Sequence, residues 1–169
     1  MPKPSFDEVS TVKDPMLNDN YDITFPSIPG GGGDGRALRL QCKTAVKPGT
    51  NLAEVEVELF GHKLMHAARR TWSNEVSIEF VEDNTGNITK ILEAWAEIAR
   101  ATRTQHGAFK ATYAVDAKLR IYDQPGNVVM TYTLRNCWPS QVPDISFDGS
   151  GGAIITLGAS FKFDIVERQ

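Results

Sequence analysis

Apolar and polar residues alternate along the last part of the chain, and this period of two is the feature that most constrains the fold. The apolar positions are Ile155, Leu157, Ala159, Phe161, Phe163 and Ile165. A period of two is typical of a β-strand with one buried face. We therefore predict one long half-buried strand that runs almost to the C-terminus. Upstream of it we expect a strand ending in Cys137-Trp138-Pro139, a short strand around Ile145 and Phe147, and a glycine-rich corner.

The same alternation predicts further strands in the first half of the chain. They span Tyr21–Phe25, Arg36–Lys43, Leu52–Leu59, Lys63–His66 and Glu75–Glu82. The side chains expected to point inward are Leu38, Leu40 and Cys42, then Ala53, Val55, Val57 and Leu59, and then Val76, Ile78 and Phe80. The glycine-rich stretch Pro26–Gly35 predicts a hairpin connection between the first two strands.

From Ile88 the apolar period changes to that of a helix. The apolar stripe consists of Ile88, Ile91, Leu92, Trp95, Ile98 and Ala99. Asn87 is the predicted N-cap, and Arg100 and Arg103 suit the negatively polarised C-terminal end. We expect one helix over about residues 88–103, lying against a sheet or a partner.

Strands return at Val115–Ile121 and Val128–Arg135, joined by a turn at Gln124–Asn127. The predicted fold class is therefore mainly β, with seven to nine antiparallel strands in a β-sandwich or barrel and one flanking α-helix. Residues 1–20 are polar and punctuated by proline, so we expect an N-terminal arm there and a single β-sandwich domain over 21–169.

Composition excludes several classes of protein. The 169 residues carry 18 basic and 21 acidic side chains, a net charge of −3, which argues against a general phosphate-binding surface. No apolar run approaches the roughly 20 residues of a membrane span. The N-terminus lacks the apolar core of a signal peptide, so we expect synthesis and assembly in a reducing cytosol. Cys42 and Cys137 are then expected as buried free thiols, and an intersubunit disulfide stays open.

The sequence contains no arrangement of residues that predicts catalysis, and we expect neither an enzyme nor a cofactor. Gly30–Arg36 superficially resembles a phosphate-binding loop, but Lys followed by Ser or Thr is missing and a strand is expected to follow. His62 and His66 would lie about 13 Å apart along a strand, too far to share a metal ion. With His106, they are interpreted as solvated histidines.

An acidic row is the candidate for a functional surface. Glu54, Glu56 and Glu58 alternate on one strand, and Glu75 and Glu79 are expected on a neighbouring one. The row is interpreted either as an ordinary solvent-facing strand side or as a wall that repels a polyanion and lets it move past. A carboxylate pair for hydrolysis is a third interpretation, although no partner in a different environment is visible.

Three stretches in this order resemble the tail tube protein family of contractile-tailed bacteriophages, which is related to the tubes of other contractile injection systems. The first is Leu40–Ala45 with the turn Lys47-Pro48-Gly49. The second is Arg70-Thr71-Trp72 with the Glu75–Glu82 strand and the Ile88–Ala99 helix that bears Trp95. The third is Leu134–Pro139 with its Trp-Pro, then Ile145–Asp148 and the terminal strand. The resemblance covers roughly residues 38–166 and leaves out the N-terminal arm, Gly30–Gly35 and extra residues around Thr104–Thr112.

The resemblance implies a structural subunit that forms six-membered rings, which stack into a hollow tube in the virion tail. It implies four partners: a contractile sheath protein, a baseplate tube initiator, a tape measure protein, and DNA that passes through the lumen without specific binding. No membrane is involved. Glu54, Glu56, Glu58, Glu75 and Glu79 are the lumen or ring-contact candidates.

Two alternatives stay open at this point. A tube of a secretion-type contractile injection system would carry effectors instead of DNA. A small-ligand-binding β-barrel, which belongs to a different class, would be a monomer with a closed apolar pocket.

Overall fold

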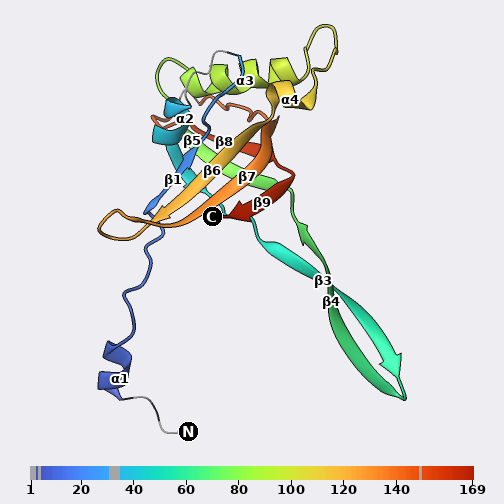
Figure 1. Ribbon diagram of the computed structural model, residues 1–169. Helices are drawn as coiled ribbons and strands as arrows, with labels where there is room; N and C mark the ends of the chain where they lie inside the picture. The colour runs from blue at the N-terminus through green and yellow to red at the C-terminus, as the bar shows by residue number, and fades with distance from the viewer. Residues whose placement is uncertain (1–2, 4, 31–34, 149) are drawn as a thin grey trace.

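The computed structural model describes residues 3, 5–30, 35–148 and 150–169. Its body is a bent antiparallel sheet of seven strands in the order β1-β6-β7-β8-β5-β2, with β9 added against β7 (Figure 1). The strands are β1 Tyr21–Thr24, β2 Cys42–Ala45, β5 Glu75–Val81, β6 Val115–Tyr122, β7 Val128–Gln141, β8 Thr156–Lys162 and β9 Ile165–Arg168. The mainly β, antiparallel fold predicted from the sequence is confirmed.

Strand β7 belongs to both halves of the bent sheet. Its first part pairs with β6 and β9, and its last part pairs with β8. Between the two parts, Asn136 has a φ of 54°, its backbone N–H donates to Asp116 (3.0 Å) and its side chain donates to Asp164 (2.7 Å). The bend is therefore fixed by a bulged residue whose backbone and side chain are both hydrogen-bonded.

The sheet does not close into a barrel. Its outer strands β1 and β2 come together where the Tyr21 hydroxyl donates to the carbonyl of Lys43 at 2.7 Å. Burial, and then the neighbouring Cys42, raise the pKa of Tyr21 to about 12, so this hydroxyl keeps its proton. At this corner, the hydrogen bond from Tyr21 to Lys43 joins β1 and β2, which do not pair as strands.

Aromatic side chains fill the space inside the bent sheet. Phe25 stacks on Phe161 with ring centroids 5.3 Å apart, and Trp95 lies edge-on to Phe25 at 5.7 Å. All three are fully buried, and the Trp95 indole N–H donates to the carbonyl of Tyr113 at 2.6 Å. The core is filled by protein side chains, unlike the closed ligand pocket that a small-ligand barrel requires.

The long helix α3 covers the core at one end of the sheet (Figure 1) and spans Asn87–Ala99, so it ends four residues before the predicted Arg103. The predicted N-cap is also wrong, because Gly86 precedes the helix with a φ of 68° and Asn87 is its first residue. The free N–H groups of Ile88 and Thr89 donate to the Glu82 carboxylate at 3.0 and 2.9 Å instead. A carboxylate from the residue that directly follows β5 therefore caps the helix.

Acid is expected to weaken this cap. Asp83 accepts hydrogen bonds from the Thr85 hydroxyl and the Asn87 backbone N–H, which lower its pKa from 3.8 to about 2. A carboxylate with a lowered pKa contributes stability above pH 3.8 and loses it as the pH falls towards 2. The melting temperature, measured by circular dichroism from pH 5 to pH 2, should fall less steeply for Asp83→Asn than for the wild type. Parallel curves would contradict this role.

Several other sequence predictions need correction near α2. Residues 36–43 do not form one strand: Arg36–Leu40 is the short helix α2, and β2 begins at Cys42. Leu38 is buried as expected, but Leu40 is 67% exposed. The predicted hairpin connection through Pro26–Gly35 is also wrong, because β1 pairs with β6 and β2 pairs with β5. The connection can turn sharply because Gly35 has no Cβ. A Cβ at this position would lie 2.3 Å from the carbonyl oxygen of Phe25. Part of the predicted Gly30–Gly35 loop, residues 31–34, lies outside the described residues.

The C-terminal segment also differs in detail from its prediction. β7 continues through Cys137-Trp138-Pro139 to Gln141, and no strand forms around Ile145 and Phe147. The predicted long last strand is divided into β8 and β9 at Phe163 and Asp164. Leu157, Ala159, Phe161 and Phe163 are buried as predicted, whereas Ile165 is exposed. The divided strand lets the segment pair with β5 first and then with the other half of β7.

Two short helices complete the described part of the chain. Helix α1, Phe6–Ser10, lies in the N-terminal arm away from the body, and α4, Lys110–Tyr113, follows the loop after α3 (Figure 1). The one helix expected from the sequence is thus joined by three short ones. None of the described helices has the length and apolar character needed to cross a membrane.

Candidate functional site: the β3–β4 hairpin

A two-stranded hairpin stands away from the body and is the most unusual feature of the molecule (Figure 1). It consists of β3, Thr50–Leu59, and β4, His62–Trp72, which pair only with each other among the described strands. β2 leads into β3 through residues 46–49, and β4 leads into β5 through Ser73 and Asn74. The hairpin therefore extends the β2–β5 pair of the sheet outwards.

One face of the hairpin carries apolar and histidine side chains. Val55 lies opposite His66, Val57 opposite Leu64, and Leu59 opposite His62. Both strands were predicted, but β4 extends well beyond the predicted Lys63–His66, and this face is not buried: Val55 is 50% exposed and Leu59 is 52% exposed. Period-two alternation identifies a strand with two different faces, and it does not say whether this chain or another one covers the apolar face.

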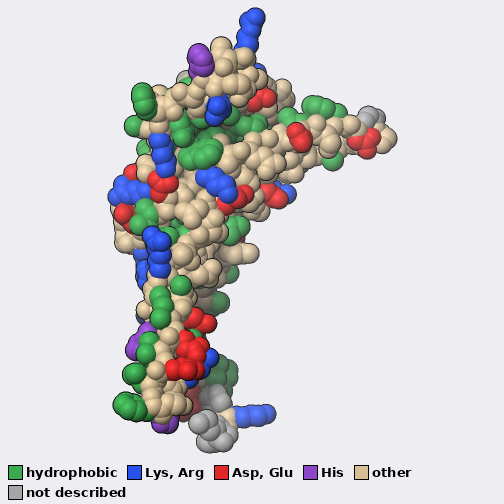
Figure 2. All heavy atoms as spheres, turned by 90° about the vertical axis from the view of Figure 1, so that its right-hand side faces the viewer, with side chains coloured by type: hydrophobic (Ala, Val, Ile, Leu, Met, Phe, Trp, Pro, Cys, Tyr) green, Lys and Arg blue, Asp and Glu red, His purple; other side chains and the backbone are tan. Residues whose placement is uncertain are grey.

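The opposite face carries the acidic row. Glu54, Glu56 and Glu58 lie opposite Ala67, Met65 and Lys63, and the Lys63 ammonium contacts the Glu56 carboxylate at 2.5 Å. Figure 2 shows acidic side chains (red) on one side of this extension, and histidine (purple) and apolar (green) side chains on the other.

Glu75 and Glu79 do not continue this row, contrary to the expectation that they lie on a neighbouring strand. Both belong to β5 in the body, where Glu75 pairs with Lys162 and Glu79 lies 3.9 Å from Lys43. The Lys162 hydrogen bond lowers the pKa of Glu75. The five glutamates therefore form two separate surfaces, one acidic and one in which each carboxylate has a cationic partner.

The hairpin ends in a two-residue turn, Phe60-Gly61, with φ values of 50° and 81°. Positive φ at both positions defines a type I′ turn, which strongly prefers Asn or Asp before Gly. Phe60 instead occupies the left-handed region at a cost of roughly 1–2 kcal/mol. Its side chain is fully exposed. Neither the turn nor the core of this chain explains a phenylalanine here.

A hairpin of this kind is marginally stable by itself. Two strands without a covering layer do not bury enough apolar surface, and their outer edges present unpaired backbone groups. Leu52, Val55, Leu59, Phe60, Leu64 and Met65 are all at least 44% exposed. An apolar surface of this kind marks an interaction site. The sequence signal for this interaction site is Phe60, a bulky residue at a turn position where Asn is preferred.

The remaining candidate residues show no arrangement for chemistry. His62, His66 and His106 are exposed, as expected, and no group of three or more His, Cys, Asp or Glu in the described residues could hold a metal ion. Cys42 and Cys137 are free thiols, and burial raises the pKa of both. A short helix, not the predicted strand, follows the glycine-rich loop, but Lys followed by Ser or Thr is still missing there.

Comparison with solved structures places the fold among tubes and their terminators. The sheath/tube terminator of an extracellular contractile injection system (PVC) gives a TM-score of 0.68 at 14% identity, covering 94% of this chain and 99% of that one. The tube terminating cap of the anti-feeding prophage gives 0.67 at 15%, covering 94% and 93%. A chain of the PVC sheath-tube complex gives 0.61 at 12%, covering 99% of each. At these identities the likeness concerns the fold.

Sequence comparison supplies the family. No curated protein matches the chain. The family model of phage tail tube proteins, however, matches residues 16–166, which include the whole hairpin and every strand of the bent sheet except the end of β9. This match confirms the resemblance drawn from the three ordered stretches of the sequence. The chain belongs to the phage tail tube protein family.

Proposed function

We propose that this chain is the structural subunit of a tail tube, in which six-membered rings stack into a hollow cylinder that conducts DNA during ejection. The observation that carries the proposal is the uncovered hairpin in a member of this family. Its apolar face and its tip need a covering surface that the described part of the chain does not provide. A neighbouring copy provides that surface in an assembly of identical subunits.

The shape of the subunit supports a repeating assembly. The hairpin and the N-terminal arm leave the body on the side away from α3, and they stand apart from each other (Figure 1). A protrusion that docks on a different surface of the next copy makes a heterologous contact, which generates rings or filaments. Residues 1–20 act in this proposal as an arm, and 21–169 as the tube domain.

The proposed partners follow from the family and from its structural neighbours. The similar chains come from a sheath-tube complex and from tube terminators, so we place the tube inside a contractile sheath. Growth would start on a baseplate initiator around a tape measure protein, within the host cytoplasm. The subunit itself performs no catalysis.

The outer face of β5 and β8 is the proposed lumen surface. It presents Glu75 and Glu79 with their lysine partners, and Ser77 lies opposite Ser160. A surface with balanced charge and small hydroxyl groups has little attraction for a polyanion, so DNA can move along it.

Negative-stain microscopy of the purified wild-type protein tests the tube proposal. We expect rings at low concentration and stacked rings or tubes at high concentration, or after addition of a baseplate initiator. A protein that stays monomeric at high concentration with the initiator present would overturn the proposal. In assembled particles, Glu75→Lys with Glu79→Lys should leave the tubes intact and slow DNA ejection. Normal ejection would exclude this face from the lumen.

A tube of a secretion-type injection system is the second candidate, because two of the structural neighbours belong to an extracellular contractile injection system. The two candidates differ in cargo and not in architecture. Purified particles that contain protein effectors and no DNA would favour the secretion-type tube.

A further inference from the structure

A groove of about 690 Å³ lies between the N-terminal arm and the turn that joins β6 to β7. It is lined by residues 13–17, 122–125 and 129, and we call it the arm groove. The arm is anchored beside it, because the Tyr122 backbone N–H donates to the carbonyl of Asn20 at 2.8 Å. Met16, Leu17 and Val129 give the groove an apolar lining, although each side chain is about half exposed. A concave apolar surface of this kind suits a protruding side chain of a partner.

The charges beside the arm groove are mostly negative. Asp14 and Asp123 line it, with Lys13 as the single cation among the described lining residues. The Asn127 side-chain amide, and then its backbone N–H, donate to the Asp123 carboxylate and lower its pKa, so this group stays charged at neutral pH. An aromatic side chain from a basic segment therefore fits the groove better than one from an acidic segment.

One strongly exposed phenylalanine meets this description. The side chains in the described part of the chain that are at least 81% exposed and aromatic are Phe6, Phe60, Phe109 and Phe147. Three of them have an acidic residue within two positions, whereas residues 98–115 around Phe109 contain no acidic residue. The cations in that segment are Arg100, Arg103 and Lys110. Lys110 is bound to Asp164 at 2.6 Å, while the two arginines make no ion pair within the described part of the chain.

Phe109 is presented by a backbone of defined shape. It ends the loop of residues 100–109, which we call the basic loop, and it directly precedes α4. The Ala108 N–H donates to the carbonyl of Ala99 at 3.2 Å, and the Phe109 carbonyl accepts from the Thr112 N–H at 2.8 Å. Hydrogen bonds on both sides therefore fix the backbone of a residue whose ring points into solvent. Little backbone entropy remains to be lost when such a loop binds.

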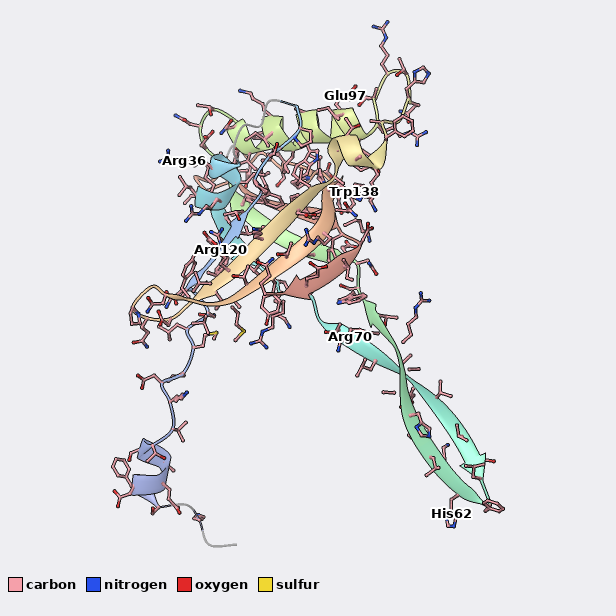
Figure 3. The ribbon with its side chains drawn as sticks, in the orientation of Figure 1. Arg36, His62, Arg70, Glu97, Arg120 and Trp138 are labelled. Atoms are coloured by element: carbon pink, nitrogen blue, oxygen red, sulfur yellow. The ribbon has the colours of Figure 1, made fainter. Side chains whose placement is uncertain are left out.

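The basic loop and the arm groove lie at opposite ends of β6. Helix α4 connects the loop to the start of the strand, and Tyr122, the last residue of β6, lines the groove. In Figure 3, Glu97 marks the end of α3 beside the loop, and Arg120 lies near the other end of β6. The eight residues of β6 separate the two ends by roughly 25 Å. Phe109 therefore does not reach the groove of its own chain.

We propose that Phe109 of one copy inserts into the arm groove of a neighbouring copy. The proposal rests on the tube function above and adds a contact in which the hairpin takes no part. Because the loop and the groove are different surfaces at opposite ends of one strand, the contact is heterologous and can repeat from copy to copy. Arg103 of the basic loop adds electrostatic attraction to Asp14 and Asp123.

Photo-cross-linking identifies the residues that position 109 contacts. p-Benzoylphenylalanine in place of Phe109 keeps an aromatic ring and bonds to nearby C–H groups on illumination. In tubes assembled from isotopically labelled and unlabelled subunits, mass spectrometry should find cross-links between different chains at the residues that line the arm groove. Cross-links within one chain, to the hairpin, or to any other surface would overturn the proposal.

Two variants measure how much the contact contributes to assembly. Phe109→Ala removes the inserted ring, and Leu17→Glu places a carboxylate in the apolar lining. Each should raise the protein concentration needed for tubes at least about tenfold. Phe147→Ala and Leu40→Glu are the matched controls, because both residues are exposed and lie outside the loop and the groove, and they should assemble like the wild type. Sedimentation measures tube formation, and melting curves check that each variant folds.

The outcomes separate this contact from the tube function. If wild-type tubes form and Phe109→Ala or Leu17→Glu assembles equally well, the contact is overturned and the tube function stands. Equal losses in the variants and in their controls would have the same meaning. A wild type that stays monomeric with a baseplate initiator present would overturn both proposals.

Discussion

Replacing Trp95 with alanine should destabilise the subunit more than any single change on its surface. The side chain is fully buried in α3, packs against Phe25 and Phe161, and donates to the carbonyl of Tyr113. Loss of a buried tryptophan costs about 3–5 kcal/mol, which lowers the melting temperature by roughly 10 °C in a domain of this size. Denaturant unfolding followed by circular dichroism measures the free energy directly.

Trp95→Phe is the matched control for this prediction. It keeps an aromatic ring in the core and removes the indole N–H, so the carbonyl of Tyr113 loses its donor at a cost of about 1–3 kcal/mol. The expected order of stability is wild type, Trp95→Phe, Trp95→Ala. An alanine variant as stable as the phenylalanine variant would show that packing around Phe25 and Phe161 contributes little.

Replacing Phe60 with asparagine should have opposite effects on the monomer and on the tube. Asparagine tolerates the positive φ at this position, so the isolated subunit should keep or raise its melting temperature. Tube assembly should weaken at least about tenfold, because removal of an aromatic anchor from an interface costs more than 1 kcal/mol. Sedimentation measures the assembly and calorimetry measures the stability of the monomer.

Phe147→Asn is the control, since Phe147 is 81% exposed in the loop after β7 and lies off the hairpin. It removes the same apolar area from the surface and should leave tube assembly unchanged. Equal losses of assembly for both variants would mean that general surface hydrophobicity, and not the hairpin tip, drives association.

The sequence predicted most strands because their side chains obey a period of two wherever one face is buried. Val76, Ile78 and Phe80 on β5 and Leu157, Ala159 and Phe161 on β8 are examples in which pattern and burial agree. The helix stripe at Ile88, Ile91, Leu92 and Trp95 was equally clear. These are the segments in which tertiary packing reinforces the local pattern.

The predictions failed where contacts distant in sequence decide the local structure. Arg36–Leu40 forms a helical turn directly after Gly35, which has a φ of 68° and approaches the backbone of Phe25, and no local pattern reveals that approach. The last strand is divided at Asp164, where Lys110 and Asn136 hold the carboxylate and lower its pKa. The hydrogen bonds that cap the N-terminus of α3 are accepted by Glu82, which lies outside the helix.

For the candidate surface, alternation located Glu54, Glu56 and Glu58 on a strand but placed Glu75 and Glu79 beside them. Strand neighbours depend on topology, and topology puts the two groups on different sheets. Exposure of Val55 and Leu59 could not be foreseen either, since an apolar face looks the same in sequence whether its partner is intramolecular or another subunit.

The joint between hairpin and body makes the two strands mechanically unequal. Asn74, between β4 and β5, donates to the carbonyls of Phe163 and Asp164 at 3.0 and 2.9 Å and accepts from the Phe163 N–H at 3.2 Å. β3 is connected to the body through residues 46–49, where the Lys47 ammonium lies 5.3 Å from the centroid of the Tyr132 ring, and then through the four residues of β2. A force that pulls on the hairpin is therefore expected to be transmitted through β4 and Asn74 to the middle of the sheet. The connection between β2 and β3 is expected to deform before the connection between β4 and β5 does.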